Sequence, residues 1–321
     1  MLKSDSSKQL PYNDYGSMMR RRFGGRVQKL AIDAGFGCPN RDGRVGRGGC
    51  SFCSSEIFSP AYCQESKSLA EQVRSAVEFH RSRRRKADYY LAYFQSGTNT
   101  YADVDTLSRA YYEVLNTGDV DGLIIGTRPD CISSEILQLL EEIAHKYYVA
   151  VEYGIESVDD ATLEHVGRGH NFSVAMEAVE LTRQAGIDVG AHFIVGLPNR
   201  SREQILDAVA TINELGLNYI KFHQLQIHRN TRIASEWVEH PERFLLGAKE
   251  SLRQYVELMV DILRRLDPAI AVDRLASSSP SRNIIHSPLG GVTVEEVRRA
   301  IVGRMEELGA LQGDLSEVDI K

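Results

Sequence analysis

The sequence predicts an α/β fold built on a parallel sheet, and three observations support this class. Short apolar runs alternate with longer segments whose apolar residues recur every three or four positions, the pattern of βαβ units. Apolar residues make up 42% of the 321 residues, which is enough for a sizeable core. Nearly every polar or glycine-rich motif directly follows an apolar run, where parallel sheets bind their ligands.

The predicted strands come first in each repeating unit and lie at 29–33, 89–94, 122–125, 148–153, 188–195 and 219–226. The helices expected between them lie at 69–80, 103–115, 133–146, 173–185 and 202–215. Six strands with intervening helices make a (βα)6 unit. Periodicity alone leaves open whether this unit forms a partial barrel of the TIM type or a doubly wound sheet.

The alternation stops after about residue 240. A long amphipathic helix is expected at 243–266, followed by a short strand at 270–272, a polar stretch and a final helix. Thr293 and Glu296 have the spacing of a capping box and predict where that final helix begins. We therefore expect a polar and basic segment at 1–24, a core at 25–240, and a C-terminal helical extension at 241–321 that caps the core.

Composition excludes several classes of protein. The chain has no run of about 18 apolar residues, so no membrane span is expected, and its polar N-terminus favours a cytoplasmic protein. Five cysteines, an odd number, favour reduced thiols and metal chemistry over a disulfide framework. The net charge of −6 argues against a protein dedicated to nucleic acid. Basic runs at 20–29 and 81–86 either contact phosphate or face water.

A glycine-rich loop after the first predicted strand carries Cys38, Cys50 and Cys53. Its glycines allow backbone conformations that other residues avoid, and they let amide groups approach an anion closely. Three thiolates suit a [4Fe-4S] cluster whose fourth iron has no protein ligand and can bind a substrate or cofactor. The alternatives are a flexible loop with structural cysteines and a four-cysteine zinc site that Cys63 completes.

The cysteine loop resembles the cluster motif of radical S-adenosylmethionine (SAM) enzymes, in the C-x11-C-x2-C form. LAIDAGFGCPNRDGRVGRGGCSFC, IIGTRPDC, VEYGIES, GRGH and HFIVGLP match, in order, a bacterial family of radical SAM proteins related to the catalytic subunit of Elongator. The resemblance favours the partial (βα)6 barrel with a C-terminal helical cap. It implies a [4Fe-4S] cluster, reductive cleavage of SAM to a 5′-deoxyadenosyl radical, and an electron donor of the flavodoxin or ferredoxin type.

The resemblance also implies which residues contact SAM. The turn after the second strand would hold the methionyl amino group, although it departs from the common Gly-Gly-Glu form, and an ordinary turn is the alternative. A carboxylate and a guanidinium, twelve residues apart, would bind the ribose and the methionyl carboxylate, or pair with each other. A glycine would lie near adenine, and a histidine would contact SAM or substrate or be a satisfied buried histidine. These residues are Gln95, Ser96, Gly97, Thr98, Glu156, Arg168, Gly196 and His223.

The Elongator-like resemblance further implies tRNA as the substrate, with a wobble uridine as the modified base. A radical SAM enzyme that acts on a small molecule or a protein is the first alternative. A zinc-binding or redox-regulatory protein without catalytic activity is the second, and it belongs to a different class. Arg128 and Asp130, after the third strand, are expected to pair with each other and shape their loop.

Overall fold

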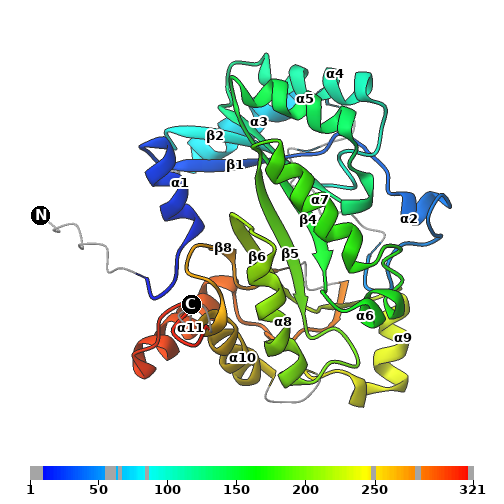
Figure 1. The fold of residues 1–321 in the computed structure, drawn as a ribbon, viewed down its shortest axis with the longest axis vertical. Helices are drawn as coiled ribbons and strands as arrows, with labels where there is room; N and C mark the ends of the chain where they lie inside the picture. The colour runs from blue at the N-terminus through cyan, green and yellow to red at the C-terminus, as the bar shows by residue number, and fades with distance from the viewer. Residues whose placement is uncertain are drawn as a thin grey trace, which may run out of the picture.

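The computed structural model describes residues 10–54, 63, 67–83, 87–246, 251–278 and 283–316. Its main sheet has seven parallel strands in the order β1-β2-β3-β4-β5-β6-β8 and curls into a half-barrel (Figure 1). The strands are Val27–Ile32 (β1), Tyr89–Phe94 (β2), Gly122–Thr127 (β3), Tyr148–Glu156 (β4), Asp188–Val195 (β5), Tyr219–Gln224 (β6) and Ala271–Arg274 (β8). The predicted partial barrel is therefore confirmed.

The strand at 270–272 was predicted as part of a cap, and this prediction is wrong. β8 instead pairs in parallel with β6 and is the seventh strand of the main sheet. The sixth strand also ends earlier than predicted, at Gln224, and the chain then forms β7 (Ile227–His228), which pairs with β9 (Ile284–His286) in a separate two-stranded sheet. The C-terminal part of the chain thus completes the barrel.

Helices cover the outer face of the barrel (Figure 1). Each of the five predicted between strands is present and begins at a residue whose side chain caps its N-terminus, which fixes where it starts. The caps are Ser68, Asp103, Ser133, Asn171 and Ser201, and the helices are Leu69–Ser82 (α3), Val104–Leu115 (α4), Ser134–Ala144 (α5), Phe172–Gln184 (α7) and Arg202–Glu214 (α8). Two short helices, Pro39–Asp42 (α2) and Asp160–His165 (α6), lie outside these five.

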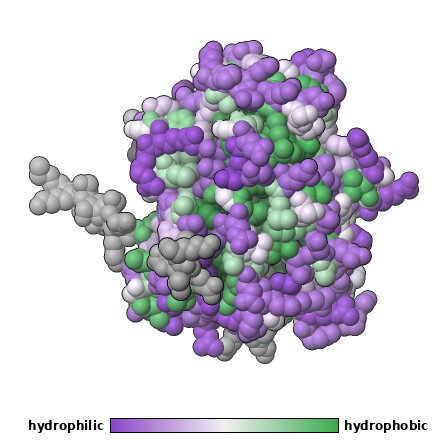
Figure 2. Space-filling model, viewed as in Figure 1, coloured by the Kyte–Doolittle hydropathy of each residue, from purple (hydrophilic) through white to green (hydrophobic). Residues whose placement is uncertain are grey.

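The helix expected at 243–266 is shorter than predicted. Residues Arg232–Glu239 form α9 and Pro241–Arg243 a 3-10 turn, and the described part of the long helix is Ser251–Arg265 (α10). α10 packs between α8 and the final helix, Val294–Leu308 (α11). The capping box of Thr293 and Glu296 opens α11 as predicted. The face of the molecule in Figure 2 is mainly hydrophilic, with apolar residues chiefly near its middle.

The amino end of the barrel is closed by α1 (Tyr15–Phe23), a helix within the segment predicted to be polar and basic. Tyr15 and Met19 are buried against Leu91, Ile124 and other inward-facing strand residues, which form a small core separate from the larger one under the outer helices. The opposite end, where the strands terminate, is left open for a site. In the described ranges, no helix is long and apolar enough to cross a membrane.

Candidate active site

A cavity of about 380 Å³ opens at the carboxyl ends of the strands, the end of the barrel where such folds bind ligands. All three loop cysteines, Cys38, Cys50 and Cys53, line it. The other walls come from residues on or just after six further strands, among them Gln95 and Thr98 after β2, Arg128 after β3, Glu156 on β4, His192 on β5, His223 on β6 and Arg274 on β8. The strand order therefore gathers motifs that are far apart in the sequence.

The cysteine loop folds back on itself beside the cavity. Cys38 precedes the single turn of α2, and Val45 and Gly49 then donate backbone hydrogen bonds to the carbonyls of Pro39 and Asn40, both at 2.8 Å. The return path is tight, because a Cβ atom on Gly46 would lie 2.2 Å from the Asn40 side-chain oxygen. This close packing requires glycine and brings Cys50 back toward Cys38.

Cationic and amide groups surround two of the thiols. The Arg41 guanidinium lies 3.0 Å from Cys53 Sγ, and Arg168 Nη1 lies 3.5 Å from Cys50 Sγ. Asn40 Nδ2 is also 3.4 Å from Cys50 Sγ. Positive charge stabilises a thiolate, and thiolates are the ligands that iron-sulfur clusters use. The donor set and its surroundings therefore fit an anionic cluster held by three cysteines.

Cys63 lies away from this group. Its thiol donates to the Ala31 carbonyl at 3.1 Å, burial raises its pKa to about 11, and it does not line the cavity. A protonated thiol engaged with the backbone is a poor metal ligand. The four-cysteine zinc site therefore gains no support from the described position of Cys63.

The turn after β2 meets the cysteine loop directly. Gly97 has a positive φ of 76°, and a Cβ atom there would lie 2.1 Å from the Phe36 carbonyl oxygen. Thr98 donates its backbone N–H to the Gly37 carbonyl at 3.0 Å. Gln95, Gly97 and Thr98 line the cavity, whereas Ser96 is buried and does not. The turn thus also fixes the approach to Cys38.

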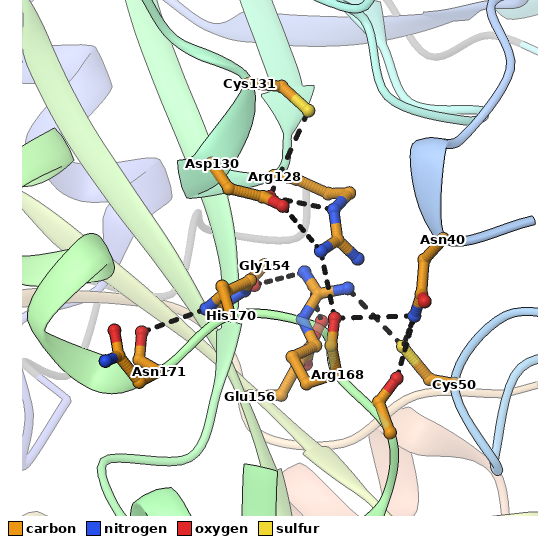
Figure 3. Close-up of polar contacts among 11 residues, drawn as sticks. Asn40, Cys50, Arg128, Asp130, Cys131, Gly154, Glu156, Arg168, His170 and Asn171 are labelled. Atoms are coloured by element: carbon orange, nitrogen blue, oxygen red, sulfur yellow. Dashed lines mark hydrogen bonds and ion pairs between the residues drawn. The ribbon is translucent and has the colours of Figure 1, made fainter. Parts of the chain in front are cut away.

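Glu156 and Arg168 lie together on the cavity wall, with 4.0 Å between Glu156 Oε1 and Arg168 Nη2 (Figure 3). Arg168 also donates to the Gly154 carbonyl, and its buried Nε has no partner within the described part of the chain. Glu156 follows a bulge in β4 and has a φ of 73°, the left-handed region that non-glycine residues rarely adopt. Strained backbone of this kind is concentrated at functional sites.

Arg128 and Asp130 pair as predicted, through two hydrogen bonds of 2.8 Å. Arg128 also donates to the Arg168 carbonyl at 2.9 Å, so the pair supports the backbone that carries Arg168 (Figure 3). Gly196, by contrast, does not line the cysteine cavity. It lines a small apolar cavity of about 50 Å³ that shares Glu156 with the larger one and includes Val195 and Leu197.

The floor of the barrel carries a buried ionic network that sequence reasoning missed. Glu152 accepts from Lys221 at 2.5 Å, from Lys29 at 3.1 Å and from His192 at 3.0 Å, and Asp273 accepts from Lys29 at 2.7 Å. Burial raises and the two lysines lower the pKa of Glu152, and the lysines prevail, so it stays ionised. The available signal was a charged residue within or directly after each of these predicted strands, at Lys29, Glu152, Lys221 and Asp273.

His223 was left as either a contact residue or a satisfied buried histidine, and it is not satisfied. Its Nε2 is buried without a hydrogen-bond partner among the described residues, and its ring lies 5.3 Å from that of His192. Burial holds the pKa of His223 well below its usual value, so the ring is neutral at physiological pH. This neutral imidazole lines the cavity.

Comparison with known proteins identifies the class. Residues 35–212 match the profile of the radical SAM superfamily, and residues 217–307 match that of its C-terminal domain. The chain therefore belongs to the radical SAM superfamily and is an enzyme of that class, which excludes the regulatory zinc protein. Members of this superfamily use a [4Fe-4S] cluster and SAM, and so does this enzyme.

Individual relatives differ in how similar their sequences and folds are to those of this chain. The chain is 36% identical to protein YhcC of Escherichia coli over 86% of each chain. It is 27% identical to a tRNA uridine(34) acetyltransferase of Dehalococcoides mccartyi, over 50% of this chain and 34% of that protein. Its fold is similar to that of Elp3 of the archaeon Methanocaldococcus infernus, with a TM-score of 0.65 at 16% identity, over 89% of this chain and 64% of that one.

Proposed function

We propose that this enzyme modifies tRNA at a wobble uridine, with Cys38, Cys50 and Cys53 holding the cluster. When bound, the cluster and SAM supply a 5′-deoxyadenosyl radical that removes a hydrogen atom. The residues of the chain bind and orient the cofactors and exclude water from them. The observation that carries the cluster and SAM part of this proposal is one cavity that joins three thiols to the strained Glu156 and to Arg168, whose Nε has no partner among the described residues.

The residues around the cavity have complementary roles in this proposal. Arg168 can donate to a methionyl carboxylate, and Glu156 can accept from ribose hydroxyls. The turn at Gln95, Gly97 and Thr98 lies next to Cys38, which suits the amino group of the same ligand. Gly196 serves the adenine side only through the small apolar cavity that it shares with Glu156.

The tRNA substrate is supported by the relative named for uridine 34 and by the position of basic residues. The run at 20–29 lies at the closed end of the barrel, where Arg22 pairs with Asp188 at the start of β5. Arg44 and Arg47, by contrast, are exposed on the cysteine loop beside the open end. We assign phosphate contact to these two arginines, because cations at the mouth can hold RNA while a base enters.

The decisive experiment is anaerobic reconstitution and reduction in the presence of SAM, with 5′-deoxyadenosine as the product measured. We expect about four irons per chain, and product that increases with total tRNA from cells that lack this protein. Cys50→Ala should abolish the product, whereas Cys63→Ala should retain it. Product formation that ignores tRNA but increases with a small-molecule extract would overturn the tRNA substrate while leaving the enzyme class intact.

We also propose an electron donor of the flavodoxin or ferredoxin type, because reductive cleavage needs one external electron per SAM. Cys53 is exposed at the protein surface and gives a short path to the cluster. To test this partner, the cluster is reduced with a purified flavodoxin or ferredoxin, and its reduction is monitored by its absorbance. A cluster that dithionite reduces and neither carrier protein reduces would contradict it.

A further inference from the structure

The last strand of the barrel carries a β-bulge that changes which side chains face inward. Ile220 pairs with Val272 and Lys221 with Arg274, so Asp273 is an extra residue without a partner on β6. Successive residues of a regular strand point to opposite faces, but a bulge re-aims them. As a result Asp273 reaches Lys29 and Lys221 inside the barrel, while its neighbour Arg274 lines the cysteine cavity.

Arg274 is the surplus charge of the barrel floor. Lys29 and Lys221 are balanced there by Glu152 and Asp273. Arg274 makes no hydrogen bond or ion pair with any residue in the ranges that the structure describes, yet its charge acts on both Lys221 and His223. A guanidinium that is partly buried without a counterion is costly unless a ligand supplies the negative charge.

His223 offers a second polar group on the wall of the same cavity. Its buried Nε2 has no partner in the described part of the chain, and its ring lines both the cysteine cavity and an adjoining cavity of about 260 Å³. The two cavities also share Phe52, Glu156 and His192. There is consequently room for a second small ligand next to the one that the cysteines and Arg168 would hold.

We propose that Arg274 and His223 form an anion subsite on the barrel floor, which binds the carboxylate of a small organic acid. A guanidinium binds a carboxylate through two parallel hydrogen bonds, and the imidazole N–H can add a third. RNA phosphate suits the subsite less well, because a flipped base enters a pocket first and leaves its phosphate outside. The acid is a co-substrate of the same cavity, so this inference rests on the proposed function.

Acetate is the probe, and saturation-transfer NMR of its methyl group measures binding to the anaerobically reconstituted full-length enzyme. We expect saturable binding that the neutral isostere acetamide does not compete for, and that Arg274→Gln weakens about tenfold or more. Arg299→Gln, which removes an equally charged but exposed side chain on α11, should bind acetate like the wild type. Equal competition by acetamide would show that the site does not select an anion.

Further measurements distinguish a small acid from RNA as the source of the anion, and failure of the subsite from failure of the proposed function. Inorganic phosphate should compete with acetate, whereas total tRNA should not, and displacement of acetate by tRNA would overturn the small acid. If Arg274→Gln does not fold, Arg274→Lys is the second variant, because lysine keeps the positive charge. Lysine cannot form the bidentate contact, so acetate binding should still weaken severalfold. Unchanged acetate binding by Arg274→Lys would contradict the subsite. Acetate binding without 5′-deoxyadenosine formation would support the subsite and refute the proposed function. Formation of 5′-deoxyadenosine without acetate binding would refute the subsite and support the proposed function.

Discussion

Glu156 combines a functional position with an unfavourable backbone. Its left-handed conformation at φ 73° costs a non-glycine residue about 1–2 kcal/mol, and the side chain stays in place facing Arg168 and the cavity. The conformation of Glu156 thus destabilises the folded protein at a position where the proposed function needs a carboxylate. A substitution that relieves the backbone and removes the carboxylate separates these two effects.

We predict that Glu156→Gly raises the free energy of unfolding by about 0.5–1 kcal/mol, because glycine adopts this conformation without strain. The same change should weaken SAM binding at least about tenfold, since one charged hydrogen-bonding group is lost. Urea unfolding and anaerobic equilibrium dialysis with SAM measure the two quantities. Asn230→Gly, at another positive φ but outside the cavity, is the control and should leave SAM binding unchanged. A destabilised Glu156→Gly protein would contradict the strain argument.

Glu152 is a buried counterion for Lys29 and Lys221 on the barrel floor. We predict that Glu152→Gln destabilises the protein by about 3–5 kcal/mol at pH 7, because Lys221 and Lys29 lose a buried counterion. The pKa of Glu152 is lowered on folding, so its contribution is present above the usual carboxyl pKa of 4.5 and is lost as pH falls below that value.

Unfolding free energies measured from pH 3 to pH 7 test this sign. The wild type should lose stability faster than Glu152→Gln as the solution becomes acidic. Adding Lys221→Met to Glu152→Gln should restore part of the lost stability, since a surplus lysine is removed from the interior. Parallel stability curves for the wild type and Glu152→Gln would show that the network carries little free energy.

At the scale of elements, the turn after β2 and the cysteine loop form one unit. We predict that Gly97→Ala lowers iron content and SAM binding, because its Cβ would collide with the Phe36 carbonyl and push the two loops apart. Gly118→Ala is a matched control, since Gly118 has a similar φ of 73° but no atom within 4 Å of the added Cβ. Both variants bear the same backbone penalty, so equal iron content would mean that loop contact is irrelevant.

The elements that could be predicted from sequence are those with strong local signals. β2 and β5 match their predicted bounds, and the capped helices begin within about one residue of expectation, because apolar periodicity and cap residues act locally. The role of β8 could not be predicted, since a four-residue strand has no long periodic pattern and its pairing with β6 depends on the whole barrel.

The candidate site divides in the same way. Cys38, Cys50, Cys53, Glu156 and Arg168 were predicted because they stand in motifs, and the structure brings them to one cavity. Nothing in the sequence indicated that Ser96 would lie outside the wall of this cavity or that Gly196 would line another cavity. Arg274 escaped notice because its inward orientation depends on a bulge, which no local pattern of the strand reveals.

At the scale of the whole molecule, a net charge of −6 coexists with exposed arginines at the mouth of the barrel. We predict that Arg44→Gln with Arg47→Gln reduces the slope of log affinity for tRNA against log salt by about 2, since each phosphate contact contributes about one unit. Filter binding across salt concentrations measures the slope. Arg20→Gln with Arg21→Gln makes the same charge change at the closed end and should not alter it; equal effects of the two pairs would indicate nonspecific attraction.

The pairing of β8 with β6 has a consequence for modularity. A chain that ended near residue 240 would keep Lys29 and Lys221 in the barrel and retain Glu152 alone of their two carboxylate partners. The C-terminal region therefore cannot be exchanged between relatives as an independent module unless donor and recipient carry matching interior charges. The smallest segment that keeps both lysines paired with both carboxylates therefore extends through β8, beyond the end of the predicted core at residue 240.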